Sequence, residues 1–147
     1  MPAIYLFAIL SFLDANSPRS SVEFSKDTLD VVKQNVAKDE AVLVDVRSEQ
    51  EWKQGHIEGS IFVPVTSLRK GGDPKVLAKT LPQKKIIYTF CVVGMRAKAA
   101  AFALEKQGYT VRALKPGYDE LVKAGFKKAK PDPPAAKDES TRQRNAG

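Results

Sequence analysis

The sequence predicts an α/β domain built on a central, mainly parallel sheet of five strands that is flanked by helices. From residue 22 to residue 126, short apolar runs typical of buried strands alternate with stretches of helical spacing, and this alternation favours a parallel sheet. Hydrophobic residues make up 43% of the 147 residues, which is enough for the core of one domain of ordinary size.

For the first part of this domain, the sequence predicts a short strand, a helix and a buried strand. Residues 22–24 form the short strand, and Ser25 is placed as the N-cap of the helix that follows. The apolar positions on one face of that helix are Leu29, Val32 and Val36. Residues 41–46 are nearly all apolar, as expected for a strand that is buried on both faces of a sheet.

Capping and turn signals divide the middle of the domain. Residues 48–51 form a capping box that opens a short helix, and Gly55 ends this helix. Residues 61–63 predict a third strand, which Pro64 stops. The stretch 67–81 contains two adjacent glycines and a proline, so it predicts a loop with one short helix.

In the last part of the domain, predicted strands and helices again alternate along the chain. Residues 86–90 predict a fourth buried strand, and the alanine-rich stretch 97–104 predicts a helix that can pack closely on a sheet. Gly108 is placed at the end of that helix. Residues 110–114 predict the fifth strand, and residues 118–124 predict the last helix.

Residues 1–21 are predicted to be a signal peptide and linker. The apolar run 3–13 is too short to span a bilayer as a helix, which needs ~20 residues, and small residues at 15–17 suit signal cleavage. No Lys or Arg precedes the run, so a hydrophobic first strand or a misassigned start codon stays open. We expect no stable membrane span, a periplasmic or exported location if residues 1–17 act as a signal, and a cytoplasmic one otherwise.

The chain is basic, with a formal net charge of +7, but this charge does not predict a nucleic-acid partner. Much of the charge lies in residues 127–147, whose Lys, Pro, Ala and Asp content predicts a disordered basic tail. No aromatic residue stands among these cations to stack on a base. We therefore interpret the tail as solvated charge.

Two residue types limit the chemistry that is available. The chain has one cysteine, Cys91, and one histidine, His56. A single cysteine excludes an internal disulfide and a multi-cysteine metal site, and a metal at His56 would need several carboxylate ligands as well. We therefore expect neither a metal nor an organic cofactor.

The segment that bears the chemistry follows the fourth predicted strand. Ligands of open α/β sheets bind just beyond the carboxyl ends of strands, where a tight loop forms an anion-binding nest of backbone N–H groups. The dipole of the following helix adds positive potential. A cysteine there ionises readily and is nucleophilic, and the same nest would hold a persulfide anion. The candidate residues are Cys91 as nucleophile and Val92, Val93, Gly94, Met95 and Arg96 as the anion-binding loop.

The residues of this loop leave alternatives open. A cysteine at a strand end is often buried and inert, but a loop with glycine at its fourth position and arginine at its sixth favours an active one. Gly94 supplies the freedom in φ that a tight loop needs. Arg96 can place a permanent charge at the rim of the loop or brace it.

Four motifs, in order and spacing, resemble the rhodanese family over about residues 22–126. They are Leu43–Arg47 with Glu51, Gly55–Pro64, Cys91–Ala97, and Gly108-Tyr109 with Pro116–Tyr118. The resemblance implies a single-domain rhodanese-type sulfurtransferase in which Cys91 carries sulfane sulfur as a persulfide. It also implies that the loop from Val92 to Arg96 binds a small anionic donor such as thiosulfate. A thiol or cyanide would be the acceptor, and a protein sulfur donor or acceptor is a further partner class.

Other functions of this cysteine loop fit the sequence less well. Cysteine phosphatases of the Cys-x5-Arg type have a longer loop than the four residues between Cys91 and Arg96, and non-catalytic modules of the same fold typically lack the cysteine. Val92, Val93 and Met95 are apolar, whereas relatives that use thiosulfate well often have basic residues nearby. A protein or low-molecular-weight persulfide is therefore the alternative donor.

Residues outside the loop are given supporting roles. Asp45 and Arg47 flank the end of a buried strand, and we expect an ion pair or loop anchor near the site, with direct substrate contact as the alternative. His56 is expected to make a structural hydrogen bond, and Trp52 is expected to pack against the sheet.

Overall fold

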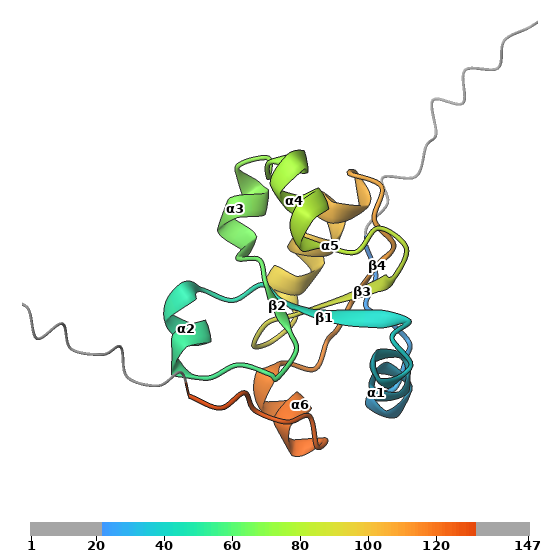
Figure 1. Ribbon diagram of the computed structural model, residues 1–147, viewed down its shortest axis with the longest axis vertical. Helices are drawn as coiled ribbons and strands as arrows, with labels where there is room; N and C mark the ends of the chain where they lie inside the picture. The colour runs from blue at the N-terminus through green and yellow to red at the C-terminus, as the bar shows by residue number, and fades with distance from the viewer. Residues whose placement is uncertain (1–21, 132–147) are drawn as a thin grey trace, which may run out of the picture.

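The fold is built on a sheet of four parallel strands in the order β2-β1-β3-β4. The computed structural model describes residues 22–131. The strands are β1 (Ala41–Asp45), β2 (Ile61–Phe62), β3 (Ile86–Phe90) and β4 (Val111–Ala113). Figure 1 shows β1 and β3 in the middle of this sheet, where all ten of their residues pair in register from Ala41↔Ile86 to Asp45↔Phe90.

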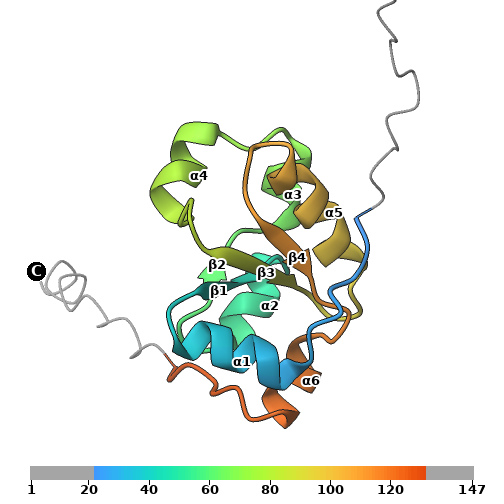
Figure 2. The same cartoon turned by 90° about the vertical axis from the view of Figure 1, so that its right-hand side faces the viewer.

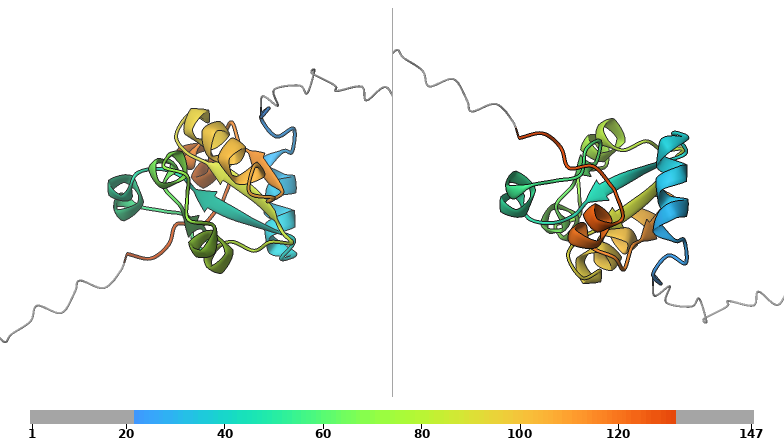
Figure 3. Two further views of the ribbon diagram at one scale, coloured as in Figure 1. Left: turned by 90° about the horizontal axis from the view of Figure 1, so that it is seen from above. Right: turned by 90° about the horizontal axis from the view of Figure 1, so that it is seen from below.

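The described residues form six helices, and five of them make two layers that cover the two faces of the sheet (Figure 2). The six helices are α1 (Leu29–Ala37), α2 (Glu49–Gln54), α3 (Val65–Arg69), α4 (Pro74–Thr80), α5 (Met95–Glu105) and α6 (Tyr118–Lys123). Helices α3, α4 and α5 lie on one side of the sheet, and α1 and α6 lie on the other. The views from above and below in Figure 3 show these two layers in turn, with α2 beyond the carboxyl end of β1.

The core consists of two clusters, one on each face of the sheet, which is why the central strands are mostly apolar. Along β3, Ile87 belongs to one cluster, whereas Tyr88 and Phe90 belong to the other. The same division separates Val44 from Leu43 on β1. Each central strand therefore buries side chains in both directions, as expected for a parallel sheet that is covered on both faces.

The first of the five predicted strands, at residues 22–24, is reduced to a single bridge, so the sheet has four strands within the described residues. Phe24 pairs with Ala113 as an isolated parallel bridge, and the N–H of Ser25 donates to the carbonyl oxygen of Ala113 at 2.7 Å. Because Ser25 is still part of this edge pairing, it does not cap α1, and the prediction of its role was wrong. Thr28 is the N-cap, and its side chain accepts a hydrogen bond from the N–H of Val31.

Two other segments differ from the expected structure. The stretch 67–81 was expected to hold one helix, but Asp73 caps a second helix, α4, whose first residue is the proline. Residues 127–131, which were expected to be disordered, are placed along residues 56–58. Lys128 bridges to Ile57, because the backbone groups of both segments satisfy each other's hydrogen bonds.

The signal peptide and linker predicted for residues 1–21, and the part of the basic tail from residue 132 to residue 147, lie outside the described residues. Within residues 22–131, no helix is both long and apolar enough to cross a membrane.

Candidate active site

Cys91 directly follows the central strand β3, so its sulfur lies at the carboxyl edge of the sheet. The residue is only 1% exposed. The backbone N–H of Gly94 donates a hydrogen bond to Sγ over 3.1 Å. The sulfur therefore faces a backbone donor at the start of α5, where the positive end of the helix dipole is located.

The loop from Val92 to Gly94 turns sharply between β3 and α5. Gly94 is the residue before α5 and has a φ of 93°, in the left-handed region that favours glycine. A Cβ at this position would come within 2.7 Å of the ring of Phe24. Packing and backbone conformation therefore both require glycine here.

Three of the predicted loop residues are apolar and largely exposed, although Cys91 between them and β3 is buried. Val92 is 47% exposed, Val93 is 71% exposed and Met95 is 70% exposed. We call these three side chains the apolar collar. These side chains are uncharged, so the exposed surface of the cysteine loop is largely apolar.

Arg96 is bound by Glu51, a residue of α2 that lies 45 positions earlier in the chain. The two terminal guanidinium nitrogens of Arg96 donate to the two carboxylate oxygens of Glu51 over 2.7 and 3.0 Å. Of the two roles that the sequence leaves open for Arg96, a charge at the rim or a brace, this contact supports the brace, because it ties the start of α5 to α2.

Glu51 is fixed from a second side by its own helix. Its Oε2 accepts hydrogen bonds from the backbone N–H and the hydroxyl of Ser48, so the predicted capping box is present. The hydrogen bonds from Arg96, followed by those from Ser48, lower the pKa of Glu51 to about 2, although partial burial acts against this. The carboxyl group is therefore ionised at neutral pH.

The carboxylate of Glu51 stabilises the charged form of Arg96. The pKa of Arg96 is raised, chiefly by its hydrogen bonds to Glu51 and further by the negative charge of that carboxylate. A cation in the first turn of a helix opposes the helix dipole. The carboxylate of Glu51 offsets that unfavourable position.

Asp45 and Arg47 form the expected ion pair, and both are almost fully buried. The guanidinium contacts both carboxylate oxygens, with the shortest contact at 2.7 Å, and it also donates to the carbonyl oxygen of Gly55 over 2.7 Å. It lies over the ring of Tyr118 at 4.1 Å from the ring centre. Arg47 therefore joins the end of β1, the end of α2 and the start of α6.

The start of α6 fixes the backbone of the cysteine loop. The N–H of Tyr118 donates to the carbonyl oxygen of Cys91 over 2.8 Å. The preceding residue, Gly117, lies so close to the loop that an added Cβ would be 1.9 Å from the carbonyl oxygen of Val92. The loop position therefore depends on a residue without a side chain at 117.

We expect Gly117→Ala to displace the loop and destabilise the chain by at least ~1–3 kcal/mol, because the methyl group overlaps backbone atoms that cannot rotate away. Urea denaturation and the rate of Cys91 alkylation measure the two effects. Gly59→Ala is the matched control, since among the described residues nothing lies within 4 Å of the added Cβ and only the positive φ is unfavourable. Equal costs for the two substitutions, with unchanged alkylation, would contradict this description.

Two small hollows flank the cysteine loop on the surface. One has a volume of about 260 Å3 and lies between the loop, α2 and α6, with Arg47, Glu51, Val92, Tyr118 and Asp119 among its lining residues. The other has about 330 Å3 and is lined by Val92, Val93, Lys115, Pro116 and Glu120.

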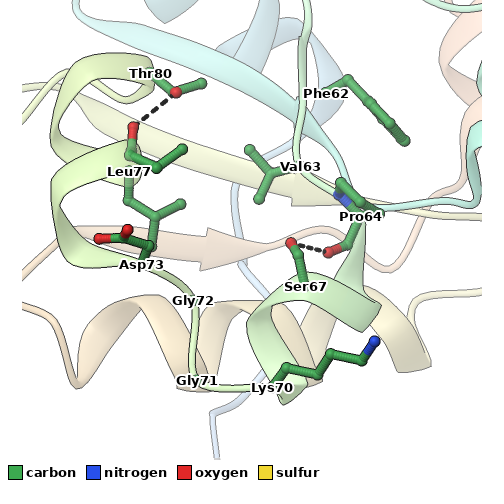
Figure 4. A pocket seen from close by; sticks show the side chains of 11 residues that line it. Phe62, Val63, Pro64, Ser67, Lys70, Gly71, Gly72, Asp73, Leu77 and Thr80 are labelled. Atoms are coloured by element: carbon green, nitrogen blue, oxygen red, sulfur yellow. Dashed lines mark hydrogen bonds between the residues drawn. The ribbon is translucent and has the colours of Figure 1, made fainter.

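Two larger hollows lie away from the loop. One of about 660 Å3 is situated between α3 and α4, where the side chains of Val63 and Leu77 point into it, and none of its lining residues belongs to the cysteine loop (Figure 4). Another of about 730 Å3 lies between α2 and the segment 128–131.

His56 and Trp52 have the packing contacts that the sequence suggests. The rings of the two residues stack with centres 3.7 Å apart, and Trp52 also stacks on Phe62 of the edge strand β2. Nδ1 of His56 lies 3.2 Å from the carbonyl oxygen of Trp52. Within residues 22–131, no group of three or more His, Cys, Asp or Glu side chains could hold a metal ion.

Sequence reasoning did not assign site roles to Glu51, Gly117 or Tyr118. Each of them acts on the cysteine loop from a distant segment of the chain, and no local pattern reports such a contact. The available signal was that these residues belong to the motifs that resemble the rhodanese family: Glu51 to the motif that contains Arg47, and Gly117 and Tyr118 to the motif that begins at Gly108.

Comparison with known proteins gives one family and several relatives. The family described as the rhodanese-like domain matches residues 28–124. YrkF of Bacillus subtilis, named as a sulfur carrier protein, is 30% identical over 95 residues, which are 64% of this chain and 48% of YrkF. MoeZ of Mycobacterium tuberculosis, named as an adenylyltransferase/sulfurtransferase, is 35% identical over 68 residues, or 46% of this chain and 16% of MoeZ.

A solved structure with similar architecture is the single-domain sulfurtransferase RDL2 of Saccharomyces cerevisiae. It is 26% identical, with a TM-score of 0.55, and the match covers 69% of this chain and 95% of that one. By contrast, this chain spans about half the length of YrkF and a smaller share of MoeZ.

Proposed function

The chain belongs to the rhodanese-like domain family, and on this premise we propose that it is a sulfurtransferase that carries sulfane sulfur as a persulfide on Cys91. The family and the sulfur-carrier and sulfurtransferase names of its relatives support sulfur transfer as the general function, with sulfur donors or acceptors as partners. The role of Cys91 and the chemistry of its donor are the further steps of the proposal.

The observation that carries the proposal is the hydrogen bond from the N–H of Gly94 to Sγ of Cys91, at the start of an 11-residue helix. A backbone donor and the helix dipole both stabilise negative charge at this position. The same surroundings suit a thiolate and the terminal sulfur of a persulfide, because both are anions. Arg96 lies in the first turn of the same helix, where it is paired with the carboxylate of Glu51.

The proposed cycle has two substitutions at sulfur. In the first, the Cys91 thiolate attacks the outer sulfur of thiosulfate, the bond between the two sulfur atoms of the donor breaks, and sulfite leaves with that bonding pair. In the second, cyanide or a thiolate attacks the terminal sulfur of the Cys91 persulfide, and the Cys91 thiolate is released. Neither step needs a general base, because each nucleophile is already an anion.

The alternative functions fit less well with the site. A non-catalytic module of this fold has no need for an activated cysteine, and Cys91 has a backbone donor on its sulfur. A phosphatase must surround a tetrahedral phosphate, whereas only four residues separate Cys91 from Arg96.

A stoichiometric transfer assay tests the proposal. The protein is incubated with donor, separated from it by gel filtration, and then treated with cyanide. We expect about one thiocyanate per chain in this second step, because the sulfur stays bound to Cys91 when the donor is removed. Thiocyanate that forms only while donor and cyanide are present together would argue against a persulfide carrier.

A further inference from the structure

We propose that Glu51 determines which donors the site accepts, by cancelling the charge of Arg96 and so disfavouring thiosulfate, a dianion, relative to donors with one negative charge. This inference rests on the proposed function. It names the substrate class as singly charged carriers of sulfane sulfur, such as persulfides and thiosulfonates. Glu51 is a specificity-determining residue in this proposal, whereas Cys91 remains the reacting group.

The first step concerns the positive charge at the loop. A dianion would need a cation at the entrance, and Arg96 is the cation that the loop itself provides. Both terminal nitrogens of its guanidinium are bound to the Glu51 carboxylate, at 2.7 and 3.0 Å. Ser48 donates two hydrogen bonds to the same carboxylate, so Glu51 is held from its own helix as well as by Arg96.

The second step concerns the charges in the two hollows that flank the cysteine loop. Glu51 itself lines the hollow beside Val92, together with Asp119 and with Arg47, whose charge is already paired with Asp45. The hollow on the other side of Val92 contains one cation, Lys115, and one carboxylate, Glu120. The charges around the entrance therefore balance or are slightly negative.

The third step concerns the apolar collar. Val92, Val93 and Met95 are about half or more exposed and carry no charge. A donor with an organic group can contact this surface and remove apolar area from water. Thiosulfate has no such group, so the collar adds nothing to its binding.

A matched pair of donors tests this proposal. Thiosulfate and methanethiosulfonate both give up their outer sulfur to a thiolate, and they release sulfite and methanesulfinate, respectively. They differ by one unit of negative charge and by a methyl group. The measured quantity is the ratio of kcat/KM for thiosulfate to kcat/KM for methanethiosulfonate, with cyanide as the acceptor.

We expect Glu51→Gln to raise this ratio by on the order of tenfold, since a unit charge near a partly exposed site interacts over several ångströms. Gln can still complete the capping box, so α2 should keep its fold. Arg96→Gln should lower the ratio, and the double variant should return it close to the wild-type value. Higher salt should reduce all of these differences, because the pair is about 30% exposed.

Glu49→Gln is the control, because it removes the same charge from the same helix. Glu49 is 69% exposed, pairs with Lys53 and does not line the hollow beside Val92. We expect its ratio to stay within about twofold of wild type. An unchanged or lower ratio for Glu51→Gln, in a protein that still transfers sulfur, would overturn the role of Glu51. Absence of transfer from both donors in the wild-type protein would instead overturn the proposed function.

Discussion

Replacing Cys91 by serine is expected to reduce cyanide-dependent thiocyanate formation to below about a few per cent of the wild-type rate. The serine hydroxyl is nearly the same size as the thiol, but it is not ionised at neutral pH and cannot form a persulfide. The rate is measured with thiosulfate and with methanethiosulfonate, so that a poor donor is not mistaken for an inactive enzyme.

The fold should survive this substitution. Cys91 loses only the hydrogen bond that its sulfur accepts from Gly94, and a hydroxyl can accept the same bond, so the free energy of unfolding should change by no more than about 1 kcal/mol. Urea denaturation of both proteins provides the control. A folded Cys91→Ser protein with substantial activity would remove Cys91 from the mechanism.

Replacing Arg47 by glutamine is expected to be the most destabilising of the substitutions considered, at ~3–5 kcal/mol. The side chains of Arg47 and Asp45 are only 6% and 0% exposed, so the substitution leaves a buried carboxylate without its cation. It also removes the contacts to Gly55 and Tyr118. Chemical denaturation measures the free energy of unfolding.

Two further variants separate charge from packing in this prediction. Adding Asp45→Asn to Arg47→Gln should restore part of the lost stability, because no uncompensated charge then remains. Lys53→Gln, which breaks the exposed pair with Glu49, should cost no more than about 0.5 kcal/mol. A cost of that small size for Arg47→Gln would show that the buried pair does not hold the three segments together.

The central part of the fold could be predicted from the sequence because its signals are local and strong. Strands β1 and β3 are buried on both faces, so they appear as nearly continuous apolar runs that are interrupted by Asp45 and Thr89. The segment beside β4, at the edge of the sheet, has no such continuous apolar run. Residues 22–24 have strand-like composition, but whether they form a strand or one bridge at Phe24 depends on their fit against β4.

The site was predictable to the extent that it is continuous in sequence. The segment from Cys91 to Arg96 was identified because strand, tight loop and helix follow one another directly. The partner of Arg96 was not, since Glu51 reaches it from another helix through folding of the whole domain. For the same reason, the order in residues 127–131 depends on pairing with residues 56–58 and has no local signal.

Peptide mass spectrometry of the protein after incubation with sulfur donor locates the transferred atom directly. The protein is separated from the donor, treated with an alkylating reagent that traps persulfides, and digested. We expect the peptide that contains Cys91 to gain the mass of one sulfur atom in addition to the alkyl group. A second sample that is treated with cyanide before alkylation should carry the alkyl group alone. A Cys91 peptide that carries only the alkyl group, from protein that forms thiocyanate, would contradict a persulfide on this residue.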